Sequence, residues 1–358
     1  MAVHFHTLKI KTIKKETPDC VSIAFDIPEE LKTTFIFEQG QNITLKKNID
    51  GEELRRSYSI CSAPFENELK VAVKKVANGK FSCYANDILQ EGDALEVLPP
   101  TGKFNTKLQA KNHKQYVAFA AGSGITPILS IIKTTLQTEP HSNFTLIFGN
   151  RSRSSIIFFE ELEALKNIYL QRFNFINILS REKTDTTINY GRIDKQKLTD
   201  LNKIINYNSI NDFFICGPEE MIFCIKDFLE QLGIDKKKIH FELFTTQSDK
   251  KVQVSKPAAE NESQHKSKIT VKADGRSFEF DLGYNNATIL DAALQQGADL
   301  PFACKGGMCC TCKAKLVEGK VEMDVNWGLE QEEVEHGFIL TCQSHPLTEK
   351  VIVDFDIK

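Results

Sequence analysis

The densest cluster of reactive side chains in the sequence lies toward its C-terminal end. Cys304, Cys309 and Cys312 have the spacing Cys-x4-Cys-x2-Cys, and Cys342 lies farther along in the segment LTCQ. Four thiolates can coordinate either one Zn²⁺ ion or a [2Fe–2S] cluster. Zinc loops usually pair two Cys-x2-Cys units, and the sequence has no second unit of this kind. The spacing therefore favours the iron–sulfur cluster, with structural zinc as the alternative.

Small residues surround these cysteines. Gly306 and Gly307 can adopt positive φ, which a loop needs to fold tightly over sulfides and present N–H groups to them. Cys310 lies in the same run, but the spacing leaves it outside the ligand set. We interpret it as a small packing residue, with a reactive thiol as the alternative.

A second group of residues could hold a flavin. Arg56, Tyr58 and Ser59 stand in RSYSI, where an Arg can pair with a pyrophosphate, a Tyr can cover a ring system and a Ser can hydrogen-bond a ring nitrogen. An ordinary strand with a polar outer face is the alternative. The segment 78–82, NGKFS, opens a predicted helix, and its N–H groups and hydroxyl suit a phosphate.

A third group fits a nicotinamide nucleotide. The segment 122–127, GSGITP, follows an apolar strand and opens a helix, but Pro127 replaces the third glycine of GxGxxG, which disfavours a simple Rossmann dehydrogenase. The turn 216–218, CGP, ends another strand. Cations near a 2′-phosphate select NADPH. The candidates, which together favour NADPH, are Arg151 with Arg153 close by, and Ser180, Arg181 and Tyr190.

The elements that must position these residues change in character along the chain. Short strands with turn residues between them predict an antiparallel β-barrel at 1–110, which contains one helix, Phe81–Leu89. Alternating strands and helices predict a parallel α/β sheet at 111–247. Its strands are expected at Tyr116–Ala121, Thr145–Phe148, Phe173–Leu179, Asp212–Cys216 and Ile239–Leu243, and its helices at Pro127–Leu136, Ile156–Asn167, Lys195–Ile205 and Glu219–Leu232.

The last part of the chain begins after a polar segment. Residues 248–267 are poor in apolar side chains and predict a flexible linker. Asp274-Gly275 predicts a hairpin between Ile269–Ala273 and Ser277–Asp281. A helix at Thr288–Gln296 and strands at Lys313–Val317 and Val351–Phe355 complete an α+β domain at 268–358.

Composition excludes several classes of protein. The 358 residues carry a formal net charge of −3, so the chain lacks the basic field of a nucleic-acid-binding protein. No segment predicts a membrane span, and the N-terminus lacks the apolar region of a signal peptide. We therefore expect a cytoplasmic protein.

In motif order, the first 247 residues resemble the ferredoxin–NADP reductase family, and the last 90 resemble plant-type ferredoxins. The resemblance implies a Greek-key barrel that binds FAD, with FMN as a minor option, and a β-grasp domain that binds the [2Fe–2S] cluster through the four cysteines. It also implies that Ser59 and Cys216 act catalytically beside the flavin and nicotinamide rings. The implied cofactor-binding residues are Arg56, Tyr58, Ser59, Val73, Lys74, Val76, Gly79, Lys80 and Ser82 for FAD, and Gly122, Gly124, Thr126, Pro127, Arg151, Ser180, Arg181, Tyr190, Cys216, Gly217 and Pro218 for NADPH.

The domain order resembles the reductase components of multicomponent oxygenases. The segments 304–346 and 149–162 are similar to the reductase subunits of ring-1,2-phenylacetyl-CoA epoxidases, which implies a separate multisubunit di-iron oxygenase as acceptor. A flavin exchanges electrons singly or in pairs, so FAD belongs between NADPH and the cluster. The alternatives are a reductase for another acceptor, such as a hybrid-cluster protein or an alkane or aromatic hydroxylase, and a redox carrier or sensor without turnover.

Overall fold

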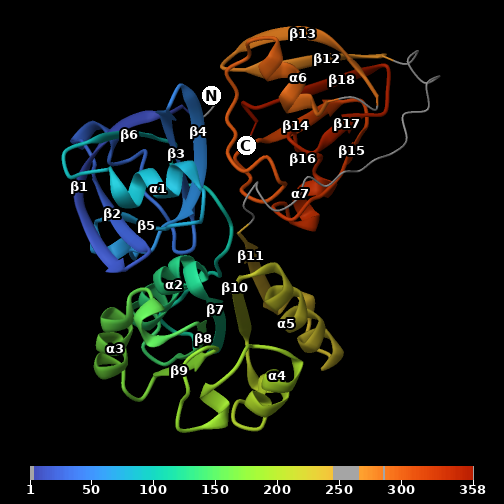
Figure 1. Cartoon of the computed structure of the whole chain (residues 1–358). Helices are drawn as coiled ribbons and strands as arrows, with labels where there is room; N and C mark the ends of the chain where they lie inside the picture. Colours follow the sequence, from blue (N-terminus) through green and yellow to red (C-terminus); the bar gives the residue numbers. More distant parts are fainter. Residues whose placement is uncertain (1–3, 245–265, 285–286, 358) are drawn as a thin grey trace. The chain divides into compact units, whose positions relative to one another are not determined.

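A computed structural model describes residues 4–244, 266–284 and 287–357 (Figure 1). Its chain contacts divide it into two compact units. One unit runs from Thr7 to Phe244, except for residues 55–57, and the other contains the C-terminal segment. Most of the expected linker lies outside the described residues, and its last two positions, 266 and 267, begin a strand.

The first half of the larger unit is an antiparallel sheet that closes on itself. Its strands follow the order β4-β3-β6-β1-β2-β5. At the end of the β4 segment, Ile60 bridges Val71 of β5, and the Cys61 N–H donates to the Lys70 carbonyl oxygen at 2.8 Å, so the two outer strands meet. The predicted barrel and its single α-helix are confirmed for the described residues. The elements are β1 (His6–Thr17), β2 (Cys20–Asp26), β3 (Asn42–Ile49), β4 (Glu52–Ser59), β5 (Leu69–Lys74), α1 (Lys80–Asp87) and β6 (Ala94–Val97).

The second half is a five-stranded, fully parallel sheet in the order β11-β10-β7-β8-β9, as predicted. The residues of β7 are almost all buried, because helices cover the sheet on both faces. The elements are β7 (Gln115–Ala121), α2 (Ile125–Thr138), β8 (Asn143–Asn150), α3 (Phe159–Ile168), β9 (Phe173–Leu179), α4 (Lys195–Asn202), β10 (Asp212–Gly217), α5 (Glu219–Gln231) and β11 (Ile239–Leu243).

The helix expected from residue 156 begins three residues later, and that prediction was wrong. Ile156 is extended, and Phe158 has a φ of 60° in the left-handed region, which no α-helix continues through. Ile156 and Ile157 are apolar because they are buried in the core as an extended segment. The apolar residues of this segment therefore belong to two structures: Ile156 and Ile157 to a buried extended segment, and the later ones to α3.

Two contacts join the barrel to the parallel sheet within the larger unit. The Ser130 hydroxyl of α2 donates to the Ser62 carbonyl oxygen at 2.7 Å. One turn farther along, the buried Lys133 ammonium lies 2.8 Å from both Glu66 and Glu161. The helix that follows the glycine-rich loop is thus held to the segment that follows the RSYSI strand.

The C-terminal unit is a mixed five-stranded sheet in the order β13-β12-β18-β14-β16, with β15 and β17 paired separately. The turn at Asp274-Gly275 has positive φ at both residues, as the hairpin prediction requires. The short elements β15, β16, β17 and α7 were not predicted. The elements are β12 (Lys266–Ala273), β13 (Arg276–Gly283), α6 (Ile289–Gln295), β14 (Lys313–Glu318), β15 (Val321–Met323), α7 (Gln331–Glu335), β16 (Phe338–Leu340), β17 (Ser344–Pro346) and β18 (Lys350–Asp354).

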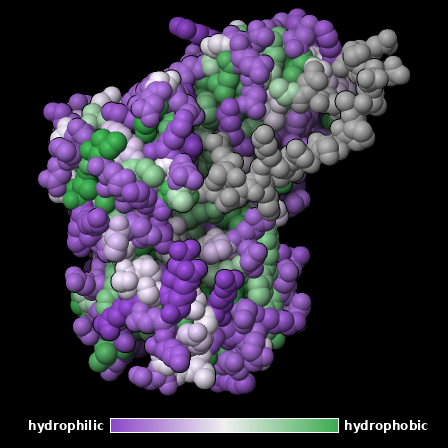
Figure 2. Space-filling model, viewed as in Figure 1, coloured by the Kyte–Doolittle hydropathy of each residue, from purple (hydrophilic) through white to green (hydrophobic). Residues whose placement is uncertain are grey.

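Hydrophilic side chains predominate among the described residues on the face drawn in Figure 2. Among the described residues, no helix is both long enough and apolar enough to cross a membrane.

Candidate functional site

The RSYSI motif occupies the end of β4. Tyr58 is half-buried, and its ring centroid lies 5.7 Å from that of Phe81 in α1. Ser59 points to the opposite side of the strand and is buried. The Arg56 guanidinium donates to the neighbouring Arg55 carbonyl oxygen at 2.8 Å. The two segments expected to bind the flavin, RSYSI at the end of β4 and NGKFS at the start of α1, therefore lie side by side.

The start of α1 is a tight turn closed by Ser82. The Ser82 hydroxyl accepts the Val76 N–H at 3.1 Å and donates to the Gly79 carbonyl oxygen at 3.1 Å. A Cβ on Gly79 would lie 2.6 Å from the Ser82 oxygen, so a larger residue there would displace the Ser82 hydroxyl from these hydrogen bonds. Lys80 forms an ion pair with Glu52. The turn leaves backbone N–H groups of the first helical turn for an anion, while the Ser82 hydroxyl already has partners.

The expected flavin residues of β5 lie at different depths. Val73 is fully buried, and Val76, beyond the end of the strand, is 39% exposed. Lys74 pairs with Asp19 at 3.6 Å. A Cβ on Gly122 would lie 3.8 Å from the Lys74 nitrogen, so this cation lies beside the glycine-rich loop.

The glycine-rich loop meets the CGP turn directly. Gly122 has a φ of +54°, and the Thr126 hydroxyl donates to the Ser123 carbonyl oxygen at 3.0 Å. Pro127 lies in the first turn of α2, where its missing N–H costs no hydrogen bond. A Cβ on Gly124 would lie 2.1 Å from the Cys216 carbonyl oxygen. Two motifs separated by about ninety residues are thus in backbone contact, and only glycine permits it.

A cluster of three polar side chains lies beside this contact. The Ser59 hydroxyl donates to the Glu242 carboxylate at 3.0 Å, and Glu242 pairs in register with Cys216 across β10 and β11. Burial, followed by the Glu242 charge, raises the pKa of the Cys216 thiol well above its usual range, so this thiol stays protonated. Glu242 could not be predicted from the motifs, because it belongs to none of them and lies here only through strand register.

The candidate residues for binding a 2′-phosphate lie at the ends of two neighbouring strands. The Arg181 N–H donates to the Arg151 carbonyl oxygen at 2.9 Å, just beyond β8 and β9. Tyr190 bridges the end of β9 and is 45% exposed. The Arg153 guanidinium covers the Phe159 ring at 4.8 Å. The two candidate sets, which the sequence left separate, form one group.

The backbone around Ser180 reinforces this group. Both the N–H and the hydroxyl of Ser180 donate to the Asn150 carbonyl oxygen, at 2.9 Å and 3.2 Å. A carboxylate also enters the loop, because Glu182 accepts the Arg153 N–H at 2.8 Å. The group therefore contains three guanidinium cations, on Arg151, Arg153 and Arg181, together with the Glu182 carboxylate.

The four cysteines form two pairs. The thiols of Cys304 and Cys309 hydrogen-bond each other, and this contact lowers the pKa of Cys309 and raises that of Cys304. Cys312 and Cys342 form a second hydrogen-bonded pair, with the pKa of Cys312 raised and that of Cys342 lowered. In the described part of the chain, no three potential ligands converge on one metal-ion position. Two pairs suit a two-iron cluster with two thiolates per iron better than one tetrahedral Zn²⁺.

The backbone near the cysteines is arranged around sulfur. The Gly306 and Cys309 N–H groups donate to the Cys304 sulfur at 3.3 and 3.5 Å. Cys310 has a φ of 55°, and its thiol donates to the Gly328 carbonyl oxygen at 2.6 Å. These contacts fit Cys310 as a packing residue outside the ligand set.

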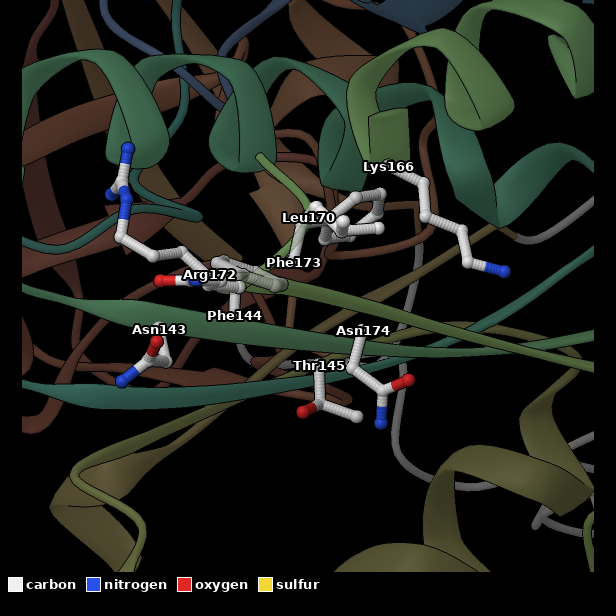
Figure 3. A pocket seen from close by; sticks show the side chains of 9 residues that line it. Asn143, Phe144, Thr145, Lys166, Leu170, Arg172, Phe173 and Asn174 are labelled. Atoms are coloured by element: carbon white, nitrogen blue, oxygen red, sulfur yellow. The ribbon is translucent and has the colours of Figure 1, made fainter. Parts of the chain in front are cut away.

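One hollow lies away from all these residues. A cavity of about 300 Å³ at the amino ends of β8 and β9 is lined by Phe144, Lys166, Leu170 and Arg172, among others (Figure 3). The Arg172 guanidinium already donates to the carbonyl oxygens of Leu136, Glu139 and Ser142. Because ligands of parallel sheets bind at the carboxyl ends, this hollow is not the nucleotide site.

Comparison with known proteins identifies all three domains. Family models match for an oxidoreductase FAD-binding domain at residues 7–106, an oxidoreductase NAD-binding domain at 119–227 and a 2Fe-2S iron-sulfur cluster binding domain at 271–347. The structure of phthalate dioxygenase reductase aligns with a TM-score of 0.58 at 24% identity, covering 98% of each chain, which supports the fold.

Several relatives match over nearly the whole chain. One of the subunits of 1,2-phenylacetyl-CoA epoxidase from Escherichia coli K12 is 46% identical, covering 99% of this chain and 98% of its own length. The ferredoxin reductase component of 3-ketosteroid-9-alpha-monooxygenase from Rhodococcus rhodochrous is 32% identical, covering 97% and 96%.

The fold and the matched domains define an oxidoreductase of the iron–sulfur flavoprotein class, with FAD, NADPH and a [2Fe–2S] cluster as cofactors. Within that class, the chain belongs to the family of reductases that includes the matched component of the Escherichia coli 1,2-phenylacetyl-CoA epoxidase. The predicted class, cofactors and family are thereby confirmed.

Proposed function

We propose that this protein passes electrons from NADPH through FAD and its [2Fe–2S] cluster to a separate di-iron oxygenase that epoxidises phenylacetyl-CoA. The contact of Gly124 with Cys216, beside the Ser59–Glu242 hydrogen bond, supports the hydride-transfer part of this proposal, and the 46% identity to the Escherichia coli epoxidase component supports the acceptor. The contact joins the glycine-rich loop, the CGP turn and the RSYSI strand at one place, as direct hydride transfer requires. The protein's place of action is proposed to be the cytoplasm.

The chain's own residues have separate proposed tasks on the flavin side. FAD supplies the step between two-electron and one-electron chemistry when bound. Arg56 and the N-terminal turn of α1, including Gly79, Lys80 and Ser82, would bind its pyrophosphate. Tyr58 would cover the ring system, and Val73, Lys74 and Val76 would line it. Ser59 would hydrogen-bond the ring, with Glu242 fixing the orientation of its hydroxyl.

On the nucleotide side, the proposed tasks follow the carboxyl edge of the parallel sheet. The loop 122–127 would bind the NADPH pyrophosphate at the start of α2. Arg151, Ser180, Arg181 and Tyr190 would bind the 2′-phosphate and adenine end. The buried Cys216 thiol and the turn through Gly217 and Pro218 would position the nicotinamide ring. Because burial keeps Cys216 protonated, it would add no negative charge beside that ring.

Serine substitutions test the proposed ligand set directly. Replacing Cys304, Cys309, Cys312 or Cys342 singly should abolish the visible absorbance and the electron paramagnetic resonance (EPR) signal of the cluster. The matched control, C310S, should retain both, because the Cys310 thiol contacts the Gly328 carbonyl oxygen. Loss of the signals in C310S, or their full retention in one of the other four variants, would refute this ligand set.

The acceptor is tested by reconstitution. The purified protein should couple NADPH oxidation to phenylacetyl-CoA epoxidation when mixed with the oxygenase subunits of a phenylacetyl-CoA epoxidase. The oxygenase of 3-ketosteroid-9-alpha-monooxygenase serves as the comparison, since its reductase is also similar in sequence. Turnover only with the steroid oxygenase would move the function to another acceptor. Reduction of cytochrome c by NADPH would exclude a carrier without turnover.

A further inference from the structure

Gln343 connects the two segments that carry the cysteines. Its side-chain nitrogen lies 2.9 Å from the Lys305 carbonyl oxygen, 2.9 Å from the Cys342 carbonyl oxygen and 3.8 Å from the Cys342 sulfur. An amide NH₂ group has two hydrogens. One is directed to Lys305, and the other is shared between the carbonyl oxygen and the sulfur of Cys342.

The rest of Gln343 packs against the same loop. Gly307 has a φ of +73°, and a Cβ there would lie 3.2 Å from the Gln343 Cγ. The Gln343 carbonyl oxygen accepts the Asp324 N–H at 2.9 Å, and the Gly307 carbonyl oxygen accepts the N–H groups of Trp327 and Gly328. Gln343 therefore contacts both the loop of three cysteines and the segment that covers it, while its own backbone adjoins the fourth cysteine.

We infer that Gln343 is a positioning residue that sets the reduction potential of the cluster through the Cys342 sulfur. This inference rests on the proposed ligand set of four cysteines. Adding an electron increases the negative charge on the cluster and its thiolates, and an N–H donor stabilises that charge. The Gln343 amide should therefore raise the potential. The hydrogen bond from the same amide to the Lys305 carbonyl oxygen fixes the loop of Cys304, Cys309 and Cys312 relative to Cys342.

The Gln343 donor to sulfur can be removed by substitution, unlike the backbone donors to Cys304. The donors to Cys304 are the backbone N–H groups of Gly306 and Cys309, which substitution does not remove. The Gln343 donor belongs to a side chain, so it can be removed while the backbone stays. A leucine retains most of the stem that packs on Gly307 and loses the amide.

The test measures the midpoint potential of the cluster in the full-length protein. The variants are Q343L and Q343E, since a carboxylate has similar shape but donates no hydrogen bond when ionised. The matched control is Q331L, which removes an exposed amide that donates to Glu335 in the same unit. Redox titration followed by EPR should give a more negative potential for both Gln343 variants and an unchanged one for Q331L. An unchanged potential in an iron-replete Q343L protein would overturn the inference.

A second measurement on the unsubstituted protein covers the case in which the variants do not assemble. Protein labelled with ¹⁵N at the glutamine side-chain amides should show a ¹⁵N hyperfine coupling to the reduced cluster in pulsed EPR. The absence of that coupling would overturn the inference. A wild-type protein with no reduced-cluster signal would instead refute the ligand set itself, so the two failures are distinguishable.

Discussion

Substituting Gly124 by alanine should separate the two halves of the hydride-transfer site. The new Cβ would lie 2.1 Å from the Cys216 carbonyl oxygen and 2.9 Å from the Gly217 nitrogen, whereas ordinary contacts begin at 3.4 Å. The loop and the CGP turn must therefore move apart by about 1 Å. A displacement of that size costs about 100-fold in rate when it misplaces reacting atoms. Overpacking should also lower the free energy of unfolding by about 1–3 kcal/mol.

Anaerobic stopped-flow measurement of flavin absorbance after mixing with NADPH gives this rate. The control is G149A in β8, where the nearest atom to the new Cβ is the end of the Ile193 side chain at 3.3 Å, which can adjust. We expect about 100-fold slower flavin reduction in G124A and about the wild-type rate in G149A. Electron transfer from a dithionite-reduced cluster to cytochrome c should be unchanged in both. A folded G124A protein with the wild-type rate of flavin reduction would refute the reasoning.

Three further predictions concern charged side chains of the larger unit. E242Q should slow flavin reduction by NADPH about tenfold, because a charged acceptor for Ser59 is lost, and an unchanged rate in stopped flow would contradict this role. K133M should lower the free energy of unfolding by about 1 kcal/mol, because it leaves the partly exposed Glu66 and Glu161 carboxylates without their shared cation, and urea titration measures the loss. For Asp212, burial by itself raises the carboxyl pKa, but the hydrogen bond with His240 and the charge of Lys114 outweigh it, so the folded pKa is lowered. The stabilisation is present above the unfolded pKa of about 3.9 and is lost as the pH falls through the lower folded value. D212N should therefore be less stable than wild type at neutral pH, and the difference should shrink in acid-unfolding titrations below about pH 4; a constant difference would contradict the assignment.

Much of the fold could be predicted from local motifs, because the residues of such a motif restrict the backbone conformation over a few positions. Asp274-Gly275 requires positive φ at two adjacent positions and therefore predicts a hairpin by itself. The continuous apolar run of Tyr116–Ala121 predicts a strand covered on both faces. The start of α3 could not be found in this way, because Ile156 and Ile157 are apolar for burial in an extended segment.

The site was predictable only where its residues belong to motifs. Glu242 has no neighbouring signal, and its place beside Cys216 follows from the register of two parallel strands. Gln343 follows a cysteine in sequence, but its contact with Lys305 depends on how the loop folds back across thirty-eight residues of chain. The register between distant strands and the path of a long loop are set by the packing of the whole domain. The spacing of residues along the chain does not encode that packing.

Electrons from NADPH are proposed to reach the cluster through the flavin within this one chain. Anaerobic addition of NADPH, followed by flavin absorbance and by the EPR signal of the reduced cluster, tests this proposal most directly. The flavin should be reduced first and the cluster afterwards, and the cluster should stay oxidised when the flavin is removed. Reduction of the cluster by NADPH in flavin-free protein, or a cluster that stays oxidised while the flavin is reduced and the oxygenase turns over, would contradict the proposal.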